Sequence, residues 1–470
     1  MISLRTVVLL AVFTVFSNAA IAGEYKAGEV IVKYKSEITR SRIAMNTMYS
    51  HLGVAKVRRY SGMMRGFEQL VLRHGINVRA VVALLNKSPF VEYAQPNYIL
   101  SINPISGLNE EESSEPAPVP AEEPPPCIIP GFPFPPGCVD DPADPSDPSP
   151  NPPATRPALQ DSPADVDPPV ADPNIEQAYG LKSIQAIDAW AEHRGSKNFV
   201  VAVIDTGIDY NHEDLAFNVW RNPNPTKEDI AGFDFVHNDG LPWDDQGHGT
   251  HTSGTVGAVG GNGKGVSGVS QRVSIMGVKF LTAEGTGTTA DAIRSIDYAI
   301  EHGAKVLSNS WGGPADEENP ILKEAVDRAK NKGVLFVAAA GNDGADNDGT
   351  SASYPAAFDN DNIIAVAAVD SGDRLPWWSN YGKKTTHVAA PGARVYSTLP
   401  GNRYGKEDGT SMACPHVAGA AALIWSKNPT WDYKKVKEVL MNTVDKIPAL
   451  ENKTIAGGRI NVLKALSYRD

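Results

Sequence analysis

Cysteine is scarce in this chain of 470 residues, which limits what can stabilise its fold. Only three cysteines are present, so disulfide bonds cannot be the main stabilising force. Cys127 and Cys138 lie close together in the sequence and predict one small disulfide loop in an oxidising compartment. Two free thiols or a bond to another chain are the alternatives. Cys414 is then left over.

Positive charge and long apolar segments are also lacking. The net charge of −12 at pH 7 argues against a protein that binds nucleic acid by neutralising phosphates. The apolar run at residues 7–16 is shorter than the about 20 residues that cross a bilayer, and no later segment suffices, so we expect no membrane span. With 41% hydrophobic and 21% charged residues, the chain has globular composition. We expect a monomer.

Residues 1–22 have the pattern of a secretory signal peptide. Arg5 precedes the apolar run, and Ala20, Ile21 and Ala22 form an A-x-A cleavage site before Gly23. We therefore expect export, either to the periplasm or out of the cell.

Proline is unevenly distributed. Residues 102–173 hold 22 of the 36 prolines, together with 14 acidic residues and a single basic one, Arg156. Such a segment cannot bury a core, and we expect an extended, disordered linker. The parts that flank it differ in charge: residues 23–101 carry +7 and residues 174–470 carry −7. Opposite charge favours association of the two parts, although two independently soluble domains would also fit.

The two flanking parts have different periodicities. Residues 23–101 predict a small α+β domain with strands at 30–34, 67–72 and 90–98 and a helix at 77–85. Residues 174–470 alternate apolar strands and helices, which predicts an α/β fold with a doubly wound parallel sheet. Its expected strands are 199–204, 273–279, 305–309, 334–339, 363–369 and 387–390. Its expected helices are 248–259, 289–302, 321–332, 410–426 and 433–444.

Four polar side chains follow these strands or open these helices, each beside a glycine. They are Asp205, His248, Asn342 and Ser411. Sites in such folds form at the carboxyl ends of the strands. A serine at a helix start has free backbone N–H groups beside it, which suit a developing oxyanion. The serine needs a base, and the base needs an acid that fixes its tautomer.

The chain order Asp, His, Ser is that of subtilisin, not that of an α/β-hydrolase. The motifs around Asp205, His248 and Ser411 resemble those of the subtilisin family of serine endopeptidases, and residues 23–101 resemble its inhibitory propeptide. The resemblance implies a subtilisin-like catalytic domain at 174–470, made as a self-processing zymogen and acting on proteins or peptides. A catalytically silent binding protein and an esterase are the rival hypotheses.

The resemblance also implies roles for individual residues. Ser411 would be the nucleophile, His248 the general base and Asp205 its orienting acid, with Asn342 in the oxyanion hole. Two segments would bind the substrate backbone by strand addition, and Ser353 would lie at the base of the primary pocket. The segments are Ser310, Trp311, Gly312 and Gly313, and opposite them Gly285, Thr286 and Gly287.

No cofactor is needed for this chemistry, but the family resemblance allows structural Ca²⁺. Asp214 matches one calcium ligand, although the partner loop 259–266 departs from the family's usual sequence. Asp234 and Asp239 match a second calcium loop in which several oxygen ligands are replaced. A solvated acidic loop without metal is the alternative.

Overall fold

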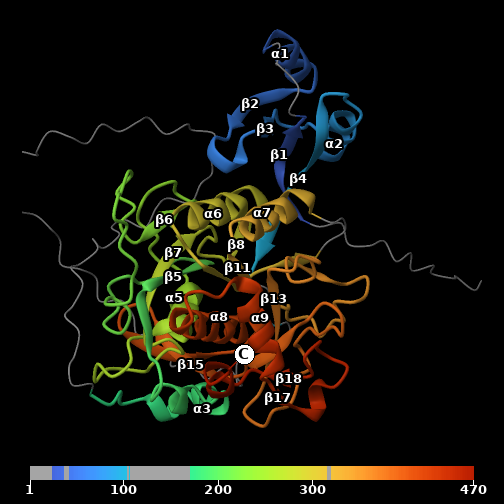
Figure 1. Cartoon of the computed structure of the whole chain (residues 1–470). Coiled ribbons are helices and arrows are strands. Elements are labelled where there is room, and N and C mark those ends of the chain that lie inside the picture. Colours follow the sequence, from blue (N-terminus) through green and yellow to red (C-terminus); the bar gives the residue numbers. More distant parts are fainter. Residues whose placement is uncertain (1–23, 36–41, 103–104, 106–169, 315–318, 470) are drawn as a thin grey trace, which may run out of the picture.

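The computed structural model describes residues 24–35, 42–102, 105, 170–314 and 319–469 (Figure 1). The predicted signal peptide, both linker cysteines and most of the predicted linker lie outside the described residues. The described chain forms a small N-terminal domain and a larger α/β domain. No helix in these described ranges is long and apolar enough to cross a membrane.

The N-terminal domain is built on an antiparallel sheet. Its helices and strands are β1 (Tyr25–Tyr34), α1 (Arg42–His51), β2 (Val54–Arg59), η1 (Gly62–Met64), β3 (Phe67–Leu72), α2 (Val78–Asn86) and β4 (Val91–Ser101). The strand order is β2-β3-β1-β4. Helix α2 begins at the cap Asn77, whose side chain accepts the amide of Ala80, and buries Val78, Val81 and Leu85 against the sheet. The predicted α+β domain is confirmed.

The α/β domain is organised around a nine-stranded sheet of order β17-β18-β14-β13-β11-β9-β5-β7-β6, parallel except at β17. Its strands are β5 (Gly195–Asp205), β6 (Gly232–Asp234), β7 (Arg272–Lys279), β9 (Val306–Asn309), β11 (Leu335–Ala339), β13 (Ile363–Val369), β14 (Val388–Pro391), β17 (Asp445–Lys446) and β18 (Gly458–Arg459). Outside it lie β8 (Thr286–Thr288), β10 (Gly313–Pro314), β12 (Ser353–Tyr354), β15 (Val395–Leu399) and β16 (Arg403–Glu407).

Helices cover both faces of this sheet. The longer ones are α5 (His248–Gly257), α6 (Thr289–Glu301), α7 (Pro320–Asn331), α8 (Thr410–Lys427) and α9 (Tyr433–Asn442). The shorter ones are η2 (Ile175–Gln177), α3 (Tyr179–Ser183), α4 (Ala186–Ala189), η3 (Pro448–Leu450) and α10 (Val462–Leu466). Along β5, Val201 and Val203 join the core under α5 and α8, whereas Ala202 and Ile204 join the core under α6 and α7. This alternation is what a sheet buried on both faces requires, and it confirms the doubly wound prediction.

The two domains share hydrogen bonds through β4. The end of β4 runs antiparallel to β8 of the α/β domain, so one sheet contains strands of both domains. Upstream in β4, the side chain of Gln95 accepts the amide of Ile321 at the start of α7, and that of Asn97 accepts the amide of Ala290 at the start of α6. These amides belong to the first turn of each helix and have no partner within it.

The predicted linker does not extend as far as residue 173. Val170 pairs with Asn262, and the buried carboxylate of Asp172 accepts the amides of Gly261 and Asn262. The α/β domain therefore includes residues from Val170 onward.

Candidate active site

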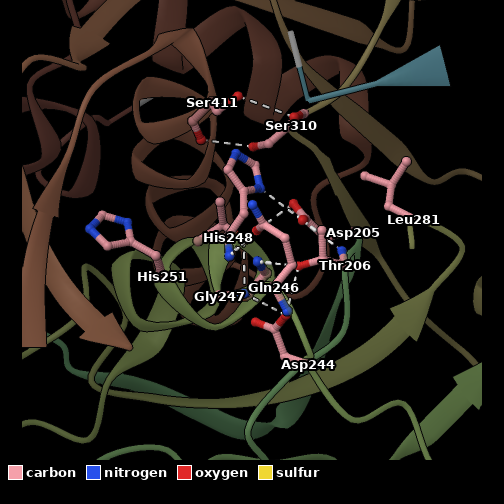
Figure 2. Close-up of polar contacts among 12 residues, drawn as sticks. Asp205, Thr206, Asp244, Gln246, Gly247, His248, His251, Leu281, Ser310 and Ser411 are labelled. Carbon is pink, nitrogen blue, oxygen red and sulfur yellow. Dashed lines mark hydrogen bonds and ion pairs between the residues drawn. The ribbon is translucent and has the colours of Figure 1, made fainter. Parts of the chain in front are cut away.

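Asp205 and His248 form a buried pair at the carboxyl edge of the sheet. Asp205 is the last residue of β5 and is fully buried, and His248 is the first residue of α5. Nδ1 of His248 lies 2.8 Å from Oδ1 of Asp205, which also accepts the amide of Thr206 at 2.7 Å (Figure 2). The contact at Nδ1 leaves Nε2 of the ring directed toward Ser411.

The electrostatics of this pair favour a protonated imidazole. Burial lowers the pKa of His248, but the charge and hydrogen bond of Asp205 outweigh burial and raise the pKa to about 9. The negative charges of Glu407 and Asp244 act in the same direction. The Asp205 carboxylate would therefore stabilise the imidazolium that forms when His248 takes a proton.

Asp244 holds the segments of Asp205 and His248 together through hydrogen bonds. It is not among the residues predicted from the sequence. Its Oδ1 accepts the hydroxyl of Thr206 at 2.9 Å and the amide of Gly247 at 2.8 Å. Its Oδ2 accepts both the amide and the hydroxyl of Thr250, at 2.8 and 2.6 Å. Asp244 thus joins the end of β5 to the first turn of α5, where a negative charge is also favoured by the helix dipole. An acid four residues before the histidine was the available signal.

Ser411 is the second residue of the central helix α8. Gly409 precedes the helix with φ of 142°, a backbone conformation that favours glycine, and this sharp entry brings Ser411 to the sheet edge. The Ser411 hydroxyl donates to the carbonyl of Ser310 at 3.1 Å. Figure 2 shows the His248 ring between this hydroxyl and Asp205. Rotation of the Ser411 hydroxyl toward the ring would let it donate to Nε2 of His248. Catalytic hydrogen bonds of this kind often form only when substrate is bound.

Asn342 lies beside the nucleophile. Its side-chain oxygen accepts the amide and the hydroxyl of Thr410, both at 2.9 Å. These two bonds fix the orientation of the Asn342 side-chain amide. Its Nδ2 then lies against the Gly409 turn, just before Ser411. An amide N–H beside the nucleophile is what the predicted oxyanion hole requires.

The two predicted substrate segments are already paired with polypeptide, namely the tail of β4. On one side, Leu100 pairs with Gly287 and Ser101 pairs with Thr286. On the other side, Ser101 exchanges two backbone hydrogen bonds of 2.9 Å with Gly312. The amide of Ile102 then donates to the carbonyl of Gly285 at 3.1 Å. The two segments therefore hold an extended chain between them, as strand addition requires.

The side chains of Trp311 and Ser353, two of the predicted substrate-binding residues, are both buried. Trp311 is buried, and its ring meets that of Phe280 edge to face at 4.9 Å between centroids. Leu100 of the bound strand is buried in the same apolar cluster. Ser353 is buried in β12, pairs with Pro314 of β10 and donates its amide to the side chain of Asn347.

Two histidines and a cysteine near the site are buried in surroundings that suit packing rather than chemistry. His251 is buried with Nε2 at 2.9 Å from the carbonyl of Val395, and burial lowers its pKa. His416 contacts the carbonyl of Met412 at 2.8 Å, and burial lowers its pKa to about 4. Cys414 is fully buried, and burial raises the pKa of its thiol to about 12, so the thiol stays protonated.

The predicted metal ligands lie in two separate places. Asp234 accepts the amides of Val236 and His237 and contacts the His237 ring at 2.9 Å, so its carboxylate closes a turn. Asp239 forms a backbone bridge with Asp234 and accepts the amide of Leu241. Within the described ranges, no three His, Cys, Asp or Glu side chains are grouped to hold a metal ion.

Asp214 lies elsewhere, beside the anchored residue Asp172. It is fully buried, and burial raises its pKa to about 8, although hydrogen bonds from Val266 and Asn262 oppose this. Neither Asp214 nor Asp172 is paired with a cationic side chain among the described residues. The two buried carboxylates are hard oxygen donors of the kind that Ca²⁺ takes, whereas Asn262 presents its Nδ2 to Asp214 at 2.8 Å. Asp172 is therefore a candidate ligand that the sequence did not reveal.

The fold and this constellation define a serine endopeptidase. Residues 196–458 match the model of the subtilase family, and residues 16–97 match the fervidolysin N-terminal prodomain. The chain belongs to the subtilase family.

Several curated proteins are similar to it. The thermophilic serine proteinase of Bacillus sp. (strain AK1) is 34% identical over 95% of this chain and 89% of its own length. Thermitase of Thermoactinomyces vulgaris is 41% identical over 62% of this chain and 96% of its own length. Subtilisin DY of Bacillus licheniformis is 41% identical over 56% of this chain and 90% of its own length. The predicted family, fold and enzyme class are thus confirmed.

Replacement of Asp205 tests the electrostatic pair. Asp205→Asn removes the charge that raises the pKa of His248 and permits the wrong tautomer, so we expect kcat to fall by about 10⁴-fold. In the wild type, kcat/KM should rise with pH until His248 is neutral, and the variant's rise should move to lower pH. The measurement is the pH profile of peptide hydrolysis. An unmoved profile would contradict this account of the His248 pKa.

Replacement of Asn342 tests the oxyanion hole. Asn342→Ala removes a donor used in the transition state, so kcat should fall by about 10²–10³-fold with little change in KM. Asn428→Ala, at the far end of α8, is the matched control and should leave kcat unchanged. Steady-state kinetics on a peptide anilide measures both. A rise in KM at constant kcat would mean that Asn342 only binds substrate.

Proposed function

We propose that this chain is an exported zymogen that processes itself and then hydrolyses proteins through an acyl-enzyme on Ser411. The observation that carries the proposal is the path of β4, whose extended end lies between Gly312 and Gly285 and leads toward Ser411. A polypeptide segment in this position is a model of how a substrate would bind. The export step is supported by the signal pattern of residues 1–22.

The proposed reaction has two halves, acylation and deacylation, and both use the same groups. The oxygen of Ser411 attacks the scissile carbonyl while Nε2 of His248 takes its proton, and Asp205 stabilises the imidazolium. Asn342 Nδ2 and the backbone N–H of Ser411 donate to the oxyanion. His248 then gives the proton to the leaving amine, which leaves an ester on Ser411. Water hydrolyses the ester by the same route, with His248 again taking and returning a proton.

The N-terminal domain is proposed as the inhibitor of this site. Its strand β4 occupies both substrate segments, and Gln95 and Asn97 bind the starts of α7 and α6. Lys33 adds an ion pair of 2.6 Å with Glu324. A substrate and this strand would need the same backbone groups of Gly285 and Gly312, so they exclude one another.

Replacement of the nucleophile tests self-processing. The Ser411→Ala chain should keep its propeptide and leave casein intact, whereas the wild type should shorten and digest casein, because the acyl-enzyme needs the Ser411 oxygen. Ser426→Ala, on the last turns of α8, is the matched control and should behave as the wild type. Intact mass and N-terminal sequencing give the cut position. A wild type that stays full length and inert would favour the binding-protein hypothesis.

Calcium is proposed to stabilise the domain through Asp214 and Asp172. In the inactive Ser411→Ala chain, Ca²⁺ at about 100 times its Kd should raise Tm by roughly 5–10 °C, and a chelator should reverse the rise. Asp214→Asn should abolish the response, whereas Asp234→Asn should keep it. Thermal unfolding with and without Ca²⁺ measures this. A response lost in the Asp234 variant instead would place the ion in the second loop.

A further inference from the structure

Lys279 is a fully buried lysine behind the active site. It is the last residue of β7, and none of its side chain is exposed. Its ammonium donates to the carbonyl of Thr206 at 2.6 Å, to Oδ1 of Asp245 at 2.7 Å and to the carbonyl of Leu281 at 2.7 Å. An ammonium has three donors, so every one is used.

The three acceptors belong to the three segments that build the site. Thr206 directly follows Asp205, Asp245 lies three residues before His248, and Leu281 begins the segment that leads to β8. Figure 2 shows Thr206 beside Asp205, with Leu281 nearby. The backbone adds to the junction, since the amide of Leu281 donates to the carbonyl of Asp205 at 3.3 Å. One side chain therefore joins three segments. They are the end of β5 with Asp205, the segment before His248, and the segment from Leu281 to Gly287, which is called the substrate edge below.

Packing alone does not explain a lysine at this position. A buried charge is costly unless it is paired and hydrogen-bonded, and an apolar residue of similar volume would fill the space without that cost. Methionine has a similar length but could not hold three oxygens. Arginine donates from a planar fork and would not match three acceptors placed around one point.

We propose that Lys279 is a positioning residue for the peptidase reaction, holding the segments of Asp205 and His248 in register with the substrate edge. The inference rests on the proposed roles of Asp205 and His248. Lys279 does not touch the reacting atoms. Its effect passes through the backbone of Thr206 and through Asp245, which set where the Asp205 carboxylate and the His248 ring lie.

The test compares Lys279→Met with the wild type in two measurements. In the full-length chain, the downfield proton resonance of the His248 Nδ1–H reports its hydrogen bond to Asp205, and it should shift or broaden in the variant. In the processed enzyme, kcat for a peptide anilide should fall by about 10–100-fold, the scale expected for a misplaced catalytic group. A short ester that does not reach β8 should show the same fall, because the lesion is at the acid and base.

Controls separate positioning from general stability. Lys437→Met removes a half-buried lysine that donates to the carbonyls of Ile363 and Asp361, away from the site. It should lower Tm but leave kcat and the proton resonance unchanged. All chains are processed by the same trace of wild-type enzyme, and the Ser411→Ala chain treated alike gives the background. Active-site titration normalises each rate to folded enzyme.

Each outcome decides the inference. A folded Lys279→Met chain with the kcat and the proton resonance of the wild type would overturn the inference. A fall in kcat for the anilide but not for the ester would also overturn it, because the effect would then lie at the substrate edge alone. If Lys279→Met does not fold, Asp245→Asn decides, since it weakens one of the three contacts: a lower kcat at wild-type Tm supports positioning, and an unchanged kcat overturns it. An inactive wild type would instead refute the proposed function.

Discussion

The parallel alignment of β5, β9 and β11 is the constraint on which the site depends. Val201, Val306 and Leu335 pair across these strands, so all three end at the same edge of the sheet. That edge receives the acid from β5, the Ser310 segment after β9 and the amide after β11. The helices α5 and α8 begin at this edge and return beneath the sheet. A base and a nucleophile on helix starts can then meet an acid on a strand end without any long loop.

Much of this arrangement was predictable from the sequence because its cause is local. The strand 363–369 is an unbroken apolar run, and its bounds match β13, since a strand buried on both faces must be apolar throughout. The helix start at Ser411 was predictable from its glycine context. The expected helix 289–302 ends one residue beyond α6, where a boundary is set by weak end effects.

Other features depend on partners far away in the chain. The strands β15 and β16 are short and partly exposed, so they lack a continuous apolar pattern, and α1 has few apolar residues in a clear stripe. Asp244 and Lys279 look like ordinary charged residues in sequence. Their importance comes from contacts that only the folded chain brings together, across 38 residues for Thr206 with Asp244 and 73 for Lys279 with Thr206. The anchoring of Asp172 was missed for the same reason.

The opposite charges of the two domains are only part of their association. Burial lowers the pKa of Lys33, but its hydrogen bonds to Glu324 and Glu92 outweigh burial and raise the pKa, which favours the charged lysine at this contact. The contacts of Gln95 and Asn97 with helix starts are neutral hydrogen bonds, which salt screens little. Directed hydrogen bonds therefore join the N-terminal domain to the starts of α6 and α7 beside the charge contact.

The two anchored ends of the intervening segment have a consequence for the order of events. Ile102 is held at Gly285 and Val170 at Asn262, and the chain between them connects the N-terminal domain to the α/β domain covalently. While that connection is intact, rebinding of β4 is intramolecular and does not depend on protein concentration. After one cut between the anchors, the same contacts obey mass action. Dilution would then favour the state in which β4 has left the substrate segments.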